Sequence, residues 1–410
     1  MARAQGSSPL ARLLAAARCS DVEACFQLAR CYAHGWQVER DAAQAHHWYL
    51  EAARHGHFEA AYRLAQLVIA EPQLVPADVL REHRTLLANA AVHGHADAAA
   101  LYGWCHQAGQ WVAIDLAAAV AWYRRAAEGG SAAGRYNLAL CLLHGRGIEA
   151  DVNAGVALLE LAAEQGYVRA QLNLGRLLSE GRHVPRDAAA ALAWYRRAAD
   201  AGYAKAQYNL GLLLAGGDGP EQDDGEAARY IALAAGQGLV KAQFTLATLY
   251  ERGLGVQKDL GLTRSWLERA ADAGYAKAQY RLSRWLRKRG AGAADARASH
   301  AWLIRAAEAG HAAAAYDLGR HCLARHEHAP ALAWFRRAAD AGHADGLYSV
   351  GVCFLQGKGV TADIIEAFVW FHRAERAGST HAGRALAKLS RKLPPAVLVQ
   401  ARARIAAERE

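Results

Sequence analysis

The sequence is poor in the residues and runs that mark several large classes of protein. Proline occurs 8 times in 410 residues and methionine once. Because proline breaks helices, its rarity leaves long stretches free to form them. No stretch approaches the roughly 18 apolar residues of a membrane-spanning helix. Arg12 and Arg18 interrupt the apolar segment near the N-terminus, so we expect no secretory signal peptide.

Cysteine is scarce and lacks a pairing pattern. The seven cysteines are an odd number, and no two form a Cys-x-x-Cys motif, which argues against a disulfide framework and a structural zinc site. Cys31, Cys105, Cys141 and Cys353 occupy a position that leucine fills elsewhere, which indicates small buried apolar side chains. We therefore expect a reducing compartment, the cytoplasm.

Charge narrows the partner without naming it. The net charge is +9 and the pI is near 9.2, so nucleic acid, anionic lipid or an acidic protein would be attracted. No run of Lys and Arg exceeds three residues, and no Gly/Ser/Arg-rich tail is present. These absences argue against nucleic acid as the main partner.

Self-similarity is the strongest feature of what is present. A glycine recurs ten times, in steps of 36 residues apart from one step of 38 and one of 32. Eight residues before each glycine is a large apolar side chain. These side chains are Trp48, Leu86, Trp122, Leu158, Trp194, Tyr230, Trp266, Trp302, Trp334 and Trp370. We expect them to fill the space between repeats.

Each repeat predicts two helices joined by a short turn. Apolar residues recur with the helical period in segments such as 190–199 and 204–214, and no alternation predicts a strand. Gly145, Gly253 and Gly357 are expected to close first helices at positive φ. An aspartate then starts the second helix as an N-cap. The predicted N-caps are Asp41, Asp115, Asp151, Asp187, Asp223, Asp259, Asp295 and Asp363.

These motifs resemble the Sel1-like repeat family, a relative of the tetratricopeptide repeats. Residues 204–214 match its Ala-x-Ala-x-Tyr-x-Leu-Gly pattern, and 190–202 match Ala-x-x-Trp-Tyr-x-x-Ala-Ala-x-x-Gly. The resemblance implies an all-α fold, an α-solenoid (a right-handed superhelix) of about ten helix hairpins over residues 21–391. Residues 1–20 would then be an N-terminal helical cap or tail, and 392–410 a C-terminal capping helix.

Two repeats depart from the pattern. The second, 58–95, lacks the Gly-x-Gly turn and contains Pro72 and Pro76, and the ninth, 312–343, is four residues short. His321, His326 and His328 crowd the ninth repeat, where a solvated turn is favoured over a metal site. The Gly-x-Gly segments join two helices, whereas a phosphate-binding loop must follow a strand. We therefore expect no cofactor and no metal.

In the tetratricopeptide fold the first helices line a concave groove, and the resemblance maps their second, fifth, ninth, twelfth and thirteenth positions onto it. Here the second position is acidic in the first three repeats and basic in repeats five to eight. A basic groove with aromatic rings suits an extended acidic peptide. The alternative is a solvated surface of family-consensus residues. The candidate partner-binding residues are Arg169, Arg176, Lys205, Tyr208, Lys241, Phe244, Arg252, Lys277, Tyr280, Arg284, Arg287, Arg320 and Trp104.

The sequence thus favours a non-enzymatic protein-protein interaction scaffold or adaptor. We expect no enzymatic activity, because almost no residues remain outside the repeats to build a catalytic domain. The Ala/Arg-rich composition suggests a bacterial source. Two alternatives stay open: an inhibitor or immunity-type partner that sequesters an enzyme or toxin, and nucleic-acid binding through the basic groove. A steep salt dependence of binding would expose the second alternative.

Overall fold

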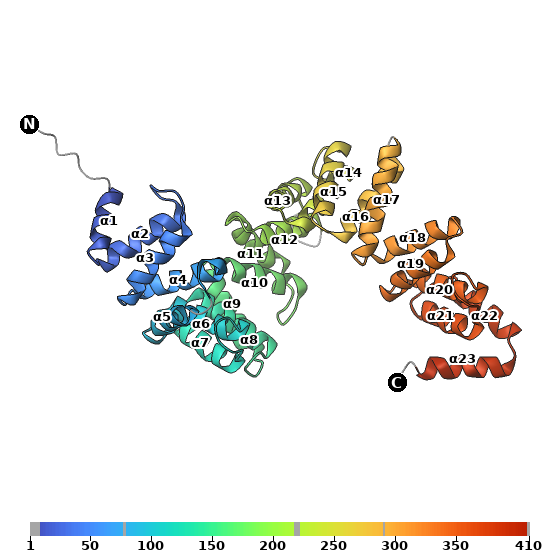
Figure 1. The fold of residues 1–410 in the computed structure, drawn as a ribbon, viewed down its shortest axis with the longest axis horizontal. Coiled ribbons are helices and arrows are strands. Elements are labelled where there is room, and N and C mark those ends of the chain that lie inside the picture. Colours follow the sequence, from blue (N-terminus) through green and yellow to red (C-terminus); the bar gives the residue numbers. More distant parts are fainter. Residues whose placement is uncertain (1–8, 77–78, 217–221, 290–291, 408–410) are drawn as a thin grey trace, which may run out of the picture. The chain divides into compact units, whose positions relative to one another are not determined.

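The computed structural model of this chain describes residues 9–76, 79–216, 222–289 and 292–407. Regular structure in these residues is helical throughout, without a strand, and the helices follow one another as hairpins (Figure 1). This confirms the all-α solenoid of about ten hairpin repeats, and the right-handed sense of the superhelix stays a prediction. None of the described helices is long and apolar enough to cross a membrane.

Ten hairpins occur in the described residues, and we number them as repeats 1 to 10. Their first helices are α2 (Val22–His34), α4 (Phe58–Ala70), α6 (Ala96–Ala108), α8 (Ala132–His144), α10 (Val168–Glu180), α12 (Ala204–Ala215), α14 (Val240–Arg252), α16 (Ala276–Arg289), α18 (Ala312–Ala324) and α20 (Ala344–Gln356). Their second helices are α3 (Ala42–Arg54), α5 (Leu80–Val92), α7 (Leu116–Glu128), α9 (Val152–Glu164), α11 (Ala188–Asp200), α13 (Asp224–Gly236), α15 (Leu260–Asp272), α17 (Ala293–Glu308), α19 (His328–Asp340) and α21 (Ile364–Arg376).

The chain divides into two compact bodies. The N-terminal body runs through Ala206, and the C-terminal body begins at Gln207, within α12. Each body has its own core of buried alanine and leucine packed against larger side chains.

Aspartate starts most second helices as predicted. The Asp187 carboxylate accepts from the backbone N–H of Ala190 at 2.9 Å, and the other predicted caps accept in the same way. Asp295 is the exception, and its prediction was wrong. Helix α17 begins at Ala293 with Gly292 as its N-cap, because the Ala293–Ala294 pair favours helix. Asp295 lies in the first turn instead, where its carboxylate is 3.4 Å from Arg264.

Both glycines of the Gly-x-Gly turn are needed, for different reasons. Gly253 ends α14 in the left-handed conformation, at φ 73°, as predicted. Gly255 also has positive φ, 66°, and a Cβ there would collide with the Asp224 backbone carbonyl at the start of α13. The second glycine therefore lets the turn approach the preceding second helix.

Small residues let the two helices of a hairpin pack closely. A Cβ added at Gly175 would lie 2.8 Å from the Tyr195 ring, and one added at Gly319 would lie 2.5 Å from the Phe335 ring. The large residue that fills this contact comes directly after the tryptophan position. Tyr195 is 4% exposed and Phe335 is 1% exposed. In these two hairpins the residue after the tryptophan is thus a deeply buried large side chain.

The tryptophans pack against apolar clusters that join neighbouring repeats, as predicted, but they are only partly buried. Trp194 packs against the core with one part of its ring and carries the Arg197 guanidinium 4.6 Å from its centroid. The arginine three positions further along the helix covers the ring in the same way at Trp266, Trp302, Trp334 and Trp370, at 4.5–4.8 Å from the ring centroid. The basic residue three positions later therefore shields the outer face of the indole.

The irregular repeats keep the hairpin. In repeat 2 a short 3-10 helix, η1 (Pro72–Leu74), replaces the glycine turn and leads toward α5. Helix α1 (Pro9–Arg18) packs on α2 ahead of the repeats. After them, α22 (Ala382–Lys392) and α23 (Pro395–Ala407) both pack on α21. The predicted tail residues 1–8 lie outside the described part of the chain.

All seven cysteines are free thiols. Cys105, Cys141 and Cys353 are buried, which confirms their interpretation as small apolar side chains, and Cys31 is partly exposed. Burial raises the pKa of the Cys105 thiol to about 12, so it stays protonated at neutral pH. In the described residues, no three His, Cys, Asp or Glu side chains gather into a group that could hold a metal ion.

Candidate functional site

The junction between consecutive first helices explains the acidic second positions. The residue before a first helix is its N-cap. Where the second position of the preceding repeat is acidic, that acid bonds to the side chain of this N-cap. His95 caps α6 by accepting from Ala98 N–H at 3.0 Å, and its Nε2 lies 2.8 Å from Glu59. Ser131 caps α8 and donates to Asp97 at 2.5 Å. The acids of the first three repeats are thus engaged in holding neighbouring repeats together.

The basic second positions face a different cap and remain open. Where the second position is Arg169, Lys205 or Lys241, the residue before the next first helix is Tyr203, Leu239 or Tyr275. None of these is the histidine or serine that bonds to an acid at the junctions described above. Each of the three basic side chains is exposed. Lys277 is the exception, because the next cap is His311, so a histidine cap does not require an acid at the second position.

The aromatic fifth positions are also part of the junction. The Phe244 ring packs edge-on against Tyr275 at 5.5 Å, and the Tyr280 ring stacks on His311 at 4.5 Å. The Tyr280 hydroxyl donates to Asp317 at 3.1 Å, and the Tyr208 hydroxyl lies 3.3 Å from that of Thr245. These half-buried rings stabilise the contact between repeats and leave only their edges for a partner.

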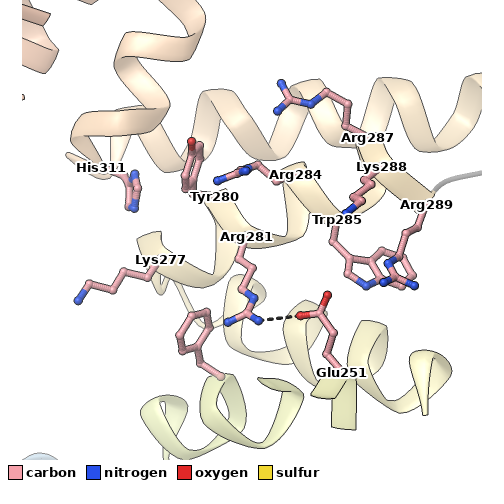
Figure 2. Close-up of a pocket in the computed structure, with 11 residues that line it drawn as sticks. Glu251, Lys277, Tyr280, Arg281, Arg284, Trp285, Arg287, Lys288, Arg289 and His311 are labelled. Atoms are coloured by element: carbon pink, nitrogen blue, oxygen red, sulfur yellow. Dashed lines mark hydrogen bonds and ion pairs between the residues drawn. The ribbon is translucent and has the colours of Figure 1, made fainter. Parts of the chain in front are cut away.

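Five of the predicted residues meet in one cavity of about 770 Å³ in the C-terminal body, which we call the repeat 8 cavity (Figure 2). They are Phe244, Lys277, Tyr280, Arg284 and Arg287. Most of the wall comes from α16, whose buried side is formed by Ala278, Leu282 and Leu286. Residues three, four, seven and eight apart share a helix face. The polar residues of α16 therefore lie on the side away from its buried residues, and this side lines the cavity.

The cavity is strongly cationic. Lys277, Arg284, Arg287, Lys288 and Arg289 are exposed and form no salt bridge within the described part of the chain. Glu251 is the one acid among the lining residues, and Arg281 already binds it at 2.6 Å, as the dashed line in Figure 2 shows. The ion pair between Arg281 and Glu251 leaves five cations to attract a ligand.

His311 closes one end of the cavity as a neutral ring. Its Nδ1 accepts from the Ala314 backbone N–H at 3.3 Å, which requires that nitrogen to be unprotonated. Burial lowers the His311 pKa, and the nearby Lys277 ammonium lowers it further. The positive charge of this site at neutral pH therefore comes from Lys and Arg.

The other predicted residues lie outside this cavity. Arg169, Arg176, Lys205 and Trp104 belong to the N-terminal body. Tyr208, Lys241, Arg252 and Arg320 belong to the C-terminal body but do not line the cavity. Arg320 instead places its guanidinium 5.9 Å from the Tyr316 ring.

Sequence reasoning missed several lining residues. Arg281 and Trp285 follow Lys277 by four and eight positions, so they share its helix face. Arg289 ends α16, and Glu251 and His311 come from the neighbouring repeats. The helical spacing from Lys277 was a sufficient signal for the first two, whereas the groove positions borrowed from the tetratricopeptide fold omitted them.

Comparison with known proteins agrees with the repeat geometry. The Sel1 repeat profile matches nine segments, which are 22–57, 96–131, 132–167, 168–203, 204–239, 240–275, 276–311, 312–343 and 344–379. These matches cover well over half of the chain. The chain belongs to the Sel1 repeat family. The unmatched segment, 58–95, is the proline-containing repeat 2, which the structure folds as a hairpin nonetheless.

A solved protein with an SLR fold shares this architecture. A protective antigen of uropathogenic Escherichia coli strains, described as displaying an SLR fold, is 27% identical, with a TM-score of 0.64 over 97% of this chain and 94% of that one. A Sel1 repeat protein from Oxalobacter formigenes is 27% identical over 94% of this chain and 91% of that one, with a TM-score of 0.49.

An immunity protein from Pseudomonas aeruginosa is 24% identical over 46% of this chain and 70% of that one, with a TM-score of 0.31. No curated protein sequence matches this chain. Sel1 repeats generally serve as scaffolds for protein interactions, so the fold found here is one used to bind other proteins.

Proposed function

We propose that this Sel1 repeat protein is a non-enzymatic scaffold or adaptor of the bacterial cytoplasm, and that its repeat 8 cavity binds an acidic segment of a partner protein. The observation that carries the proposal is the set of five cations without a salt bridge, on one face of α16 and its last turn. The free cysteines favour a reducing compartment. The similarity to an Escherichia coli protein favours a bacterial source.

The chemistry of the cavity selects a peptide carrying several carboxylates. Arg284 and Arg287 offer planar guanidinium groups that can bind a carboxylate through two hydrogen bonds, and Lys277 and Lys288 add point charges. The half-buried edges of Phe244 and Tyr280 supply apolar contact between these charges. A segment with two or more Asp or Glu residues and an intervening apolar side chain would match both features.

A binding assay with a defined probe tests the proposal. We expect a fluorescent glutamate-rich peptide to bind the full chain, and the double variant Arg284→Glu, Lys288→Glu to weaken it by roughly tenfold or more, since each lost charge-assisted bond contributes about 1.5–3 kcal/mol. The control is Lys258→Glu, Arg297→Glu, which makes the same change in net charge at exposed positions outside the cavity.

The outcomes separate local binding from general attraction. Equal weakening by both double variants would mean that overall charge, not the cavity, attracts the peptide. Tighter binding of a single-stranded oligonucleotide of equal charge, with a steep salt dependence, would favour nucleic acid instead.

A further inference from the structure

A second groove lies in the C-terminal body, where the repeats end. It has a volume of about 670 Å³, and its walls come from α20 on one side and α22 on the other. Both helices pack on α21, whose fully buried Phe371 ring forms part of the floor. The groove thus runs between α20, the first helix of repeat 10, and α22, which follows the ten hairpins.

One wall of the groove is apolar. Tyr348, Val352 and Leu355 follow one another on α20 at intervals of four and three residues, so they form a row along one helix face. Leu355 is 37% exposed, and Ile364 at the groove margin is 38% exposed. Large apolar side chains are seldom grouped together in one exposed groove on a protein surface.

The other wall is cationic. Arg384, Lys388 and Lys392 follow one another on α22 at intervals of four residues, which places them about 12 Å from first to last along the helix. All three are exposed, no acid lines the groove, and none of the three forms a salt bridge within the described chain. Ala382, Leu386 and Leu389 of α22 are buried and anchor the helix, and Leu389 also lines the groove.

The two parallel rows identify the kind of occupant. An α-helix presents a row of side chains at the same one-turn interval, so an apolar row beside an acidic row would meet both walls over about three turns. A fatty acid carries a single carboxylate and would satisfy one of the three cations. A nucleic-acid strand would leave the apolar wall uncovered.

We propose that this groove docks an amphipathic acidic helix of a partner protein, with its apolar row against Tyr348, Val352 and Leu355 and its acidic row against Arg384, Lys388 and Lys392. The proposal does not rest on the repeat 8 cavity, which has no lining residue in common with this groove. The two sites differ in chemistry, since only the second combines an unbroken apolar row with its charges.

A designed peptide provides the test. The probe is a fluorescent helical peptide of about 18 residues with leucines four and three apart and glutamates four apart on the adjoining face, and its control is a scrambled peptide of the same composition. Binding to the full chain is followed by anisotropy. We expect Lys388→Glu to weaken binding about tenfold or more, and Leu355→Asn to weaken it about threefold or more.

Matched variants make the result decisive. Lys258→Glu and Arg297→Glu each reverse an exposed charge that lines neither this groove nor the repeat 8 cavity, so both should change the affinity by less than about twofold. Circular dichroism checks that each variant is folded. Three results would overturn the proposal: no saturable binding of the designed peptide, equal binding of the scrambled peptide, or unchanged affinity in both Lys388→Glu and Leu355→Asn.

Discussion

At the scale of single residues, the tryptophan and the residue after it divide the work of packing. Trp194 keeps part of its ring at the surface beneath Arg197, whereas Tyr195 points into the hairpin against Gly175. The sequence pattern shows both as large apolar residues, so it could not say which was buried. The small residue on the facing helix determines which of the two side chains is buried. The sequence pattern gives the position of that small residue but not the side chain that packs against it.

This division predicts a difference in stability between two neighbouring truncations. We expect Tyr195→Ala to lower the free energy of unfolding by about 3–5 kcal/mol, because it empties a buried site. Trp194→Ala should cost about 2 kcal/mol, because its ring is partly solvated already. Urea unfolding of the two variants measures both values. A larger loss for Trp194→Ala would reverse the assignment.

Two histidines in the N-terminal body, His46 and His83, bond to each other through their rings. Nε2 of His46 lies 2.8 Å from Nε2 of His83, and Nδ1 of His83 lies 3.1 Å from the Val79 carbonyl oxygen. His83 therefore donates to Val79 and accepts from His46. Burial lowers the His46 pKa below its ordinary value of 6.5, and His83, His47 and Arg54 add to this against the opposing Glu82.

The histidine pair predicts a loss of stability in acid. A group whose pKa is depressed by folding contributes its full stability above the unfolded pKa, and that contribution is lost as pH falls through the folded value. The urea midpoint should therefore drop as pH falls below about 6.5. His46→Gln keeps a donor for His83 without titrating, so its drop should be smaller. Identical pH profiles for the two proteins would contradict this account.

At the scale of the helix and turn, much could be predicted and the failures have local causes. Seven aspartate caps follow from the sequence because an N-cap needs only a short acceptor before a helical pattern. Asp295 fails because alanines precede it and extend the helix. The role of Gly255 was missed because it depends on the carbonyl of Asp224, which lies in the preceding second helix.

The second glycine of the turn predicts a specific steric effect. Gly255→Ala should lower stability by about 3 kcal/mol or more, since it combines backbone strain with a collision against the preceding helix. Gly274 is the matched control: its φ is 83°, but nothing lies within 4 Å of an added Cβ. Gly274→Ala should therefore cost only about 1–2 kcal/mol. Equal losses in thermal or urea unfolding would show that strain alone decides.

The junction between repeats contains a pattern that the sequence already carried. An acid at the second position is followed by a histidine or serine cap in the next repeat, as in Glu59 with His95 and Asp97 with Ser131. Three of the four bases are followed by Tyr203, Leu239 or Tyr275, whereas Lys277 is followed by the histidine cap His311. Comparing repeats within the chain would have identified the junction acids. The positions alone, taken one repeat at a time, could not.

At the scale of the whole molecule, acidic and basic side chains have different roles. Acids of the early repeats bond to the caps at the junctions between repeats, and five of the cations of repeat 8 have no acidic partner in the described chain. The repeat count and the fold follow from periodicity, because each hairpin repeats the same packing problem. The cavities do not follow from periodicity, because they arise where neighbouring repeats differ.

The central claim is that the repeat 8 cavity captures an acidic protein segment, and capture from the host's own lysate tests it most directly. The wild-type chain and its Lys277→Glu, Arg284→Glu variant are each immobilised, with and without nuclease, at a low and a high salt concentration. We predict that a protein with an acidic segment is retained by the wild type at low salt and lost from the variant. Retention of the same proteins by both chains, or capture that disappears with nuclease treatment, would contradict the claim.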